Sequence, residues 1–124
     1  MLTSRRKARE EAFKMLFQID VNEDIEPNFV SPFTERIVQG VIEHKEKIDR
    51  LIEKYLINWT LERISLVDKT LLRMAIYEIC FEDDVPFAVS INEAVELAHK
   101  YGDEKSGKFI NGVLSNIIKK GDTI

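Results

Sequence analysis

Hydrophobic positions along the chain recur at the spacing of an α-helix, and no stretch alternates for long enough to predict a strand. The first periodic segment, residues 4–20, places its apolar side chains within one arc of a helical wheel; they are Ala8, Ala12, Met15, Leu16 and Ile19. Residues 22–28 are polar and contain Pro27, so we expect a loop there. The pattern as a whole predicts an all-α fold.

A second helical region begins at Ser31 and Pro32, which make a favourable pair for an N-cap and a first helical turn. Its apolar spacing continues to Leu56, a length that is unusual for a single helix in a small domain. We therefore expect a bend or a break between Gly40 and Lys47, which would divide the region into two shorter helices.

The later helices carry recognisable start signals. Ser65 and Asp68 resemble a capping box in front of the most hydrophobic helix of the chain, which we expect to be the central and most buried one. Ser90 and Glu93 form a full capping box that would open the next helix, although Pro86 could start it a turn earlier. A final helix is predicted from the spacing of Phe109, Val113 and Ile117, and it ends with the cations Lys119 and Lys120 before Gly121.

Composition fits one compact domain over residues 1–124. The chain is 44% hydrophobic and carries a net charge of −4, which is consistent with a modest core. Its apolar runs are far shorter than the roughly 20 residues needed to span a bilayer, so we expect no membrane segment. The N-terminus has neither a secretory nor a transit pattern, and the single Cys80 fits a reduced core residue. These features predict a cytoplasmic protein.

Patterns typical of catalysis are absent from the sequence. His44 and His99 lie far apart, and no metal-ligand spacing, glycine-rich phosphate loop or nucleophile elbow occurs. Glu78 and Glu82 lie one helical turn apart, but such a pair is more typical of a solvated acidic face or an acidic docking surface than of a general acid and base. We therefore expect a protein that is not an enzyme and has no cofactor and no metal site.

The N-terminus is basic although the chain as a whole is acidic. Its first nine residues contain no acid and four bases, which are Arg5, Arg6, Lys7 and Arg9. Cations in the first turns of a helix oppose the helix macrodipole, so a group outside this helix should compensate for them. A basic end on an acidic protein predicts a binding site for a polyanion.

Two phenylalanines extend this basic cluster along the first helix. Arg6, Arg9, Phe13 and Phe17 follow one another at helical spacing and form a stripe beside the core face. Guanidinium groups pair with phosphates and stack on bases, so the stripe suits single-stranded RNA, a protein partner, or both. Alternatively, Phe13 and Phe17 could simply widen the core face of the helix.

Four segments together resemble the NusB family. They are residues 5–10 (RRKARE), 72–78 (LRMAIYE), 85–98 (which contain VP and INEAVELA) and 108–114 (KFINGVL), and their order and gaps also agree with the family. The resemblance implies two packed helical bundles with about seven helices in total. It also implies a non-catalytic factor in bacterial transcription antitermination and ribosomal RNA synthesis. NusB-like proteins bind the boxA element of nascent RNA as a heterodimer with NusE, a small-subunit ribosomal protein, within an elongation complex of RNA polymerase and other Nus factors.

The resemblance also assigns roles to individual residues. The positions that match RNA-binding positions of the family are Arg5, Arg6, Lys7, Arg9, Lys108 and Phe109. Lys105 stands where some relatives carry an acid, which implies RNA binding that depends less on NusE, and we include it in the RNA site. The expected NusE contacts are Phe13, Phe17, Glu78 and Glu82, with Phe17 in place of a tyrosine that is frequent in relatives.

Two other readings stay open at this point. The related N-terminal module of ribosomal RNA cytosine methyltransferases shares the helical fold, but we expect it less because no cofactor-binding half follows Ile124. A helical adaptor that binds only proteins could use the same arginines on an acidic surface. The sequence does not decide between a monomer and a homodimer.

Overall fold

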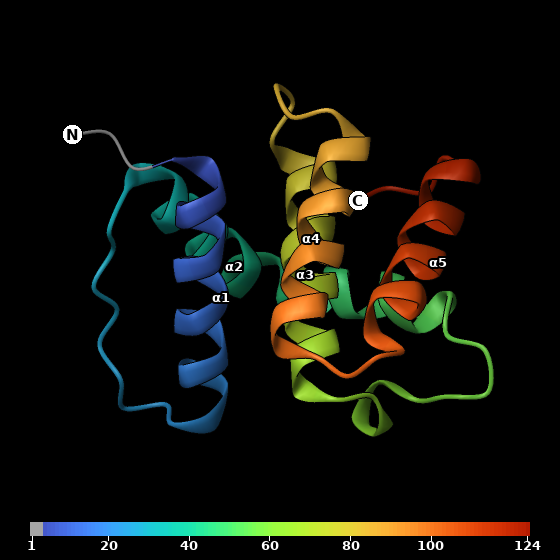
Figure 1. Ribbon diagram of the computed structural model, residues 1–124, viewed down its shortest axis with the longest axis horizontal. Coiled ribbons are helices and arrows are strands. Elements are labelled where there is room, and N and C mark those ends of the chain that lie inside the picture. The colour runs from blue at the N-terminus through green and yellow to red at the C-terminus, as the bar shows by residue number, and fades with distance from the viewer. Residues whose placement is uncertain (1–3) are drawn as a thin grey trace.

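The computed structural model describes residues 4–124 and is helical throughout that range, without a strand (Figure 1). The elements are α1 (Arg5–Val21), α2 (Pro32–Lys54), the short 3₁₀ helix η1 (Leu61–Arg63), α3 (Leu66–Phe81), α4 (Phe87–Tyr101) and α5 (Ser106–Lys119). The all-α prediction is confirmed. The expected seven helices in two bundles are not matched, because five α-helices share one hydrophobic core.

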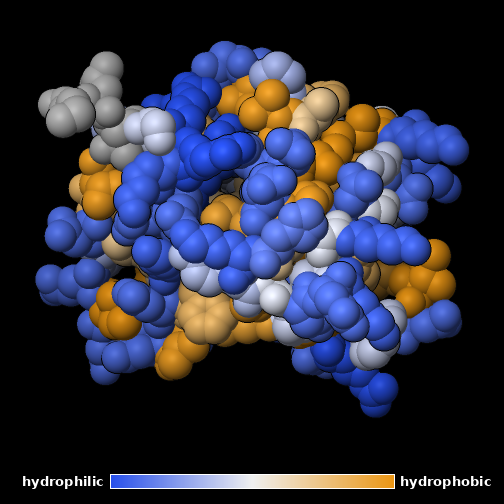
Figure 2. Space-filling model, in the orientation of Figure 1, coloured by the Kyte–Doolittle hydropathy of each residue, from blue (hydrophilic) through white to orange (hydrophobic). Residues whose placement is uncertain are grey.

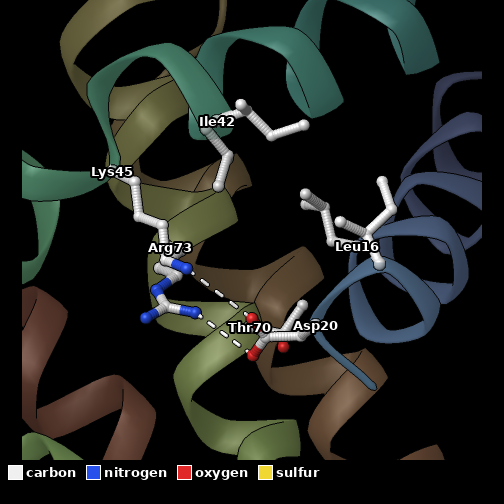
Figure 3. A pocket seen from close by; sticks show the side chains of 8 residues that line it. Leu16, Asp20, Ile42, Lys45, Thr70 and Arg73 are labelled. Atoms are coloured by element: carbon white, nitrogen blue, oxygen red, sulfur yellow. Dashed lines mark ion pairs between the residues drawn. The ribbon is translucent and has the colours of Figure 1, made fainter. Parts of the chain in front are cut away.

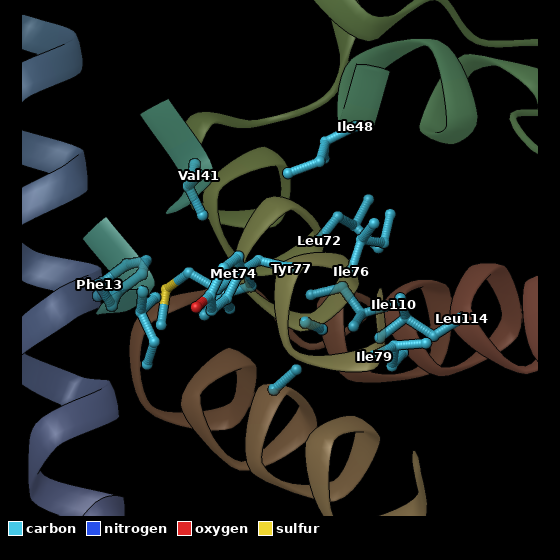
Figure 4. Close-up of a cluster of buried hydrophobic side chains, with 14 of the residues drawn as sticks. Phe13, Val41, Ile48, Leu72, Met74, Ile76, Tyr77, Ile79, Ile110 and Leu114 are labelled. Carbon is cyan, nitrogen blue, oxygen red and sulfur yellow. The ribbon is translucent and has the colours of Figure 1, made fainter. Parts of the chain in front are cut away.

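Helix α3 is the centre of this arrangement. It contacts α1 and α2 on one side and α4 and α5 on the other (Figure 1). Figure 4 shows that Leu72 and Ile76 point toward Ile110 and Leu114 of α5, whereas Met74 points toward α1. The prediction of a central, most buried helix is therefore confirmed: every residue from 70 to 79 is buried.

Three helices begin with a serine cap. The hydroxyl oxygen of Ser4 accepts a hydrogen bond from the Lys7 amide, and Ser31 and Ser65 do the same for the amides three residues later. Each such bond satisfies one of the amides that a helix start leaves without a partner. The predicted starts at Ser31 and Ser65 are confirmed.

Helix α2 is one continuous helix, so the predicted break between Gly40 and Lys47 is wrong. Gly40 is buried where α2 crosses α3, and a Cβ atom at this position would overlap the ring of Tyr77. The glycine thus allows a close approach of two helices and does not interrupt the helix in which it stands.

Helix α4 begins immediately after Pro86, a turn earlier than the Ser90 capping box predicts. The Ser90 hydroxyl is buried and donates to Glu78 instead of capping the helix, and Glu93 pairs with Arg6. The proline starts the helix because its fixed φ is compatible with a helical first turn. The serine and the glutamate are therefore free to make contacts with other helices.

The single cysteine lies near the C-terminal end of α3. Cys80 is partly buried against the core, and this burial raises the pKa of its thiol. Within residues 4–124, no helix combines the length and the apolar composition needed to cross a membrane.

Candidate nucleic-acid interface

Arg9, the last of the four basic residues at the N-terminus, is buried. Arg9 donates three hydrogen bonds to the Glu78 carboxylate, with its Nε at 3.1 and 2.9 Å and its Nη2 at 2.8 Å. Only 6% of the Arg9 side chain and 3% of the Glu78 side chain are exposed. Each side chain is thus enclosed and satisfied by the other, and the expected contacts of Arg9 with RNA and of Glu78 with NusE stay predictions.

Glu93 contacts both the buried Arg9 and the exposed Arg6. Its Oε1 lies 3.6 Å from Nη1 of Arg9, and it also accepts a hydrogen bond of 3.2 Å from Nε of Arg6. Its Oε2 accepts a second bond of 2.8 Å from Nη2 of Arg6. The Arg6 hydrogen bonds lower the pKa of Glu93 below its usual value. The Arg6 side chain is nevertheless 71% exposed, so part of its guanidinium group remains open to a ligand.

The guanidinium groups of three arginines lie close to the ring of Phe33. The Phe33 ring centroid lies 4.4 Å from Cζ of Arg5 and 5.2 Å from Cζ of both Arg9 and Arg36. Such cation–π contacts hold the groups in fixed positions around the ring. Arg5 also pairs with Asp84 at 3.1 Å on the surface. Sequence reasoning missed Phe33 and Arg36, because no local pattern marks the contacts of Phe33 with α1 or of Arg36 with Glu82.

The predicted acidic face is only partly present. Glu82 is 7% exposed and accepts hydrogen bonds from Arg36 at 3.0 and 3.1 Å and from the Tyr77 hydroxyl at 2.7 Å. Burial alone would raise the pKa of Glu82, but these hydrogen bonds lower it below its usual value. Asp83 and Asp84 are exposed, whereas Glu82 is buried, and its expected contact with NusE stays a prediction.

The two phenylalanines of α1 have different environments. Phe13 is 3% exposed and its ring centroid lies 4.9 Å from that of Tyr101 and 5.9 Å from that of Phe17. Phe13 therefore belongs to the core, as the alternative for the two phenylalanines expects, and its contact with NusE stays a prediction. Phe17 is only partly buried, so it retains a surface that a partner can reach.

A second group of cations lies at the far end of α4 and the start of α5. Lys100, Lys105 and Lys108 are exposed. Lys100 and the Tyr101 hydroxyl both bind the Glu10 carboxylate, and these hydrogen bonds lower the pKa of Glu10 to about 2. Arg6 and Lys100 line the same groove between α1 and α4. In Figure 2, which has the orientation of Figure 1, this side of the molecule is mostly hydrophilic with a few hydrophobic patches.

Lys7 and Phe109 are the other residues that the sequence predicts for the RNA site. Lys7 is exposed and pairs with Glu11 at 3.1 Å within α1. Phe109 is partly buried and packs against the core.

A small cavity between α1, α2 and α3 is lined by a second group of ion pairs, in which Asp20 and Lys45 are exposed. Its volume is about 40 Å³, enough for water but not for a nucleotide. Figure 3 shows Arg73 and Lys45 pointing toward Asp20, with each N–O distance 3.6 Å. Arg73 also binds Asp49 at 2.7 and 2.9 Å, so it links α3 to α2. This cavity belongs to the architecture of the fold and does not contribute to the interface.

The chain is similar to known proteins over most of its length. The family model described as "NusB family" matches residues 6–119. The transcription antitermination protein NusB of Bacillus licheniformis is 53% identical, over 91% of this chain and 95% of its own length. The corresponding protein of Bacillus subtilis is 51% identical, over 91% and 93%.

Solved structures show the same fold. A structure of T. maritima NusB has a TM-score of 0.88 and 41% identity, over 97% of this chain and 94% of that one. A crystal structure of the antitermination factors NusB and NusE in complex with double-stranded RNA has a TM-score of 0.82 and 30% identity, over 97% and 99%. With a family match over most of its length and relatives at about half identity, the chain belongs to the NusB family.

Proposed function

We propose that this protein is a transcription antitermination factor that binds boxA RNA together with NusE and supports the transcription of ribosomal RNA. Its close relatives carry the name of this activity, and a similar protein has been crystallised with NusE and RNA. In this role it acts in the cytoplasm, in an elongation complex with RNA polymerase and other Nus factors. It acts by binding, without a catalytic step or a cofactor.

The RNA surface that we propose consists of exposed cations from two ends of the chain and one aromatic residue. They are Arg5, Arg6, Lys7, Lys105, Lys108 and Phe109. The observation that carries this proposal is the state of Arg6, which is held by Glu93 along one edge while most of its side chain is exposed. A guanidinium group fixed in this way can pair with a phosphate at little cost in side-chain entropy.

The contact with NusE is proposed to involve Phe17 and the exposed acids near the end of α3. Asp83 and Asp84 provide a local negative charge that can attract a basic ribosomal protein. The buried residues Glu78 and Glu82 act indirectly, because they fix the arginines that hold α1 and α2 against α3.

A fluorescence titration tests the proposal. Labelled boxA RNA and a scrambled RNA of the same composition are titrated with the protein, alone and with purified NusE. We expect a preference for boxA RNA and tighter binding when NusE is present. A protein that showed no preference in either condition, but bound NusE, would be an adaptor of the protein-binding kind.

A further inference from the structure

An open groove of about 640 Å³ runs between α4 and α5, on the other side of α4 from Arg6. Asn92, Val95 and His99 line it from α4, and Lys108 and Asn111 line it from α5. The chain has 22 acidic residues, yet no acidic side chain lines this groove. A polyanion can therefore enter it without charge repulsion from its walls.

The side chains of the groove suit the bases of a nucleic acid. A side-chain amide carries both a donor and an acceptor, which is the combination that a base edge presents. Both Asn92 and Asn111 are exposed. Ser115 donates to Oδ1 of Asn111 at 3.3 Å, which leaves the amide NH₂ of Asn111 available. Val95 adds apolar surface between these polar groups, against which the face of a base can pack.

A glycine brings an aromatic ring into the wall of the groove. A Cβ atom at Gly107 would lie 2.8 Å from Nε2 of His99, so the imidazole lies against the backbone at the start of α5. His99 also lines the groove that contains Arg6 and Lys100, where Glu93 pairs with Arg6, Glu10 pairs with Lys100, and Glu96 is a third carboxylate. The imidazole therefore stands where the two grooves meet, between the cations of α1 and those of α5.

We propose that the groove between α4 and α5 reads the bases of single-stranded RNA, while the exposed part of the Arg6 guanidinium group holds a phosphate on the other side of α4. In this arrangement a strand crosses α4 at His99. Asn92 and Asn111 bind base edges, and Lys108 pairs with a phosphate at the rim. The inference rests on the proposed function, because it assigns base recognition to one part of the RNA surface.

The test separates base recognition from phosphate binding. Asn92→Ala and Asn111→Ala are compared with Asn116→Ala, which removes an exposed amide of α5 outside this groove. Each protein is titrated with boxA RNA and with the scrambled RNA over a series of salt concentrations. Loss of one hydrogen bond to a base should lower the preference for boxA RNA by about two- to tenfold. The salt dependence should not change, because no charge is removed.

Each outcome bears on one claim. A reduced preference in the two groove variants, with Asn116→Ala unchanged, supports the groove as the site of base recognition. If the wild-type protein prefers boxA RNA and both groove variants keep that preference, the groove is not the site of base recognition. The same conclusion follows if Asn116→Ala lowers the preference as much as the groove variants do. In both cases the proposed function stands. If the wild-type protein shows no RNA preference, the proposed function fails and the inference fails with it.

Discussion

Arg9 and Glu78, which are 69 residues apart in the sequence, form a buried ion pair that joins α1 to α3 through three hydrogen bonds. The basic N-terminus therefore has two parts with different roles. Arg9 fixes the helix to the core, whereas Arg6 and Lys7 stay on the surface. Glu93 contacts both Arg9 and Arg6 and so connects the structural part to the exposed part.

Glu78→Gln should destabilise the protein by about 3 kcal/mol, because it leaves the charge of Arg9 buried without its main partner. Glu93 remains 3.6 Å from Arg9 and still compensates part of its charge. The expected loss of stability therefore lies at the low end of the range for breaking a buried ion pair. Urea denaturation measures this difference. Asp83→Asn removes a charge from an exposed neighbour and serves as the control, with an expected change within about 0.5 kcal/mol. Equal stability of the two variants would show that the buried pair contributes nothing specific.

Gly40→Ala and Gly112→Ala should have opposite effects on stability. The added methyl group at Gly40 meets the ring of Tyr77, which is buried and bonded to Glu82, so we expect a loss of about 1–3 kcal/mol. Nothing lies near a Cβ at Gly112 in α5, so the better helix propensity of alanine should add about 0.5–1 kcal/mol. Thermal and urea denaturation of both variants check this. A Gly40→Ala protein as stable as wild type would contradict the close crossing of α2 and α3.

Glu10 should make stability depend on pH in the acidic range. Its pKa is about 2 in the folded protein because Lys100 and Tyr101 donate hydrogen bonds to it, and the usual value is 4.5. A lowered carboxyl pKa contributes stability above the unfolded value, and this contribution is lost as the pH falls from 4.5 toward 2. Wild type should therefore exceed Glu10→Gln in stability at pH 7, and the difference should shrink over that interval.

Denaturation curves at several pH values measure this difference. Glu53→Gln, at an exposed position of α2, is the matched control. A gap between wild type and Glu10→Gln that stayed constant down to pH 2 would mean that the contact between α1 and α4 does not depend on the charge of Glu10.

Local signals predicted the helices well, and contacts between distant segments explain where the prediction failed. The serine caps at Ser31 and Ser65 and the apolar spacing of α3 are properties of a few neighbouring residues, so the sequence alone predicts them. The meaning of Gly40 depends on Tyr77 in another helix, so a glycine that looked like a break marks a helix crossing. The capping box at Ser90 failed for the same reason, because its hydroxyl binds Glu78.

At the candidate site, too, the sequence does not show contacts between distant segments. Sequence spacing placed Arg6 and Arg9 on one stripe, but it could not show that Arg9 meets a carboxylate from the middle of α3. It did predict that a group outside the first helix would compensate for the basic cluster. Part of that compensation comes from within the protein, through Glu78 and Glu93. Arg6 remains exposed in spite of this pairing.

The salt dependence of RNA binding tests the central claim most directly, namely that exposed cations hold RNA phosphates while the buried arginine holds the fold. The affinity for boxA RNA is measured over a salt series for wild type, for the double variant Arg6→Ala/Lys108→Ala and for the control Arg63→Ala, with circular dichroism to check folding. Each lost phosphate contact should flatten the log–log slope by about 0.7, so the double variant should lose about 1.4 and bind more weakly, with the control unchanged. An unchanged slope and affinity in the folded double variant would contradict the account.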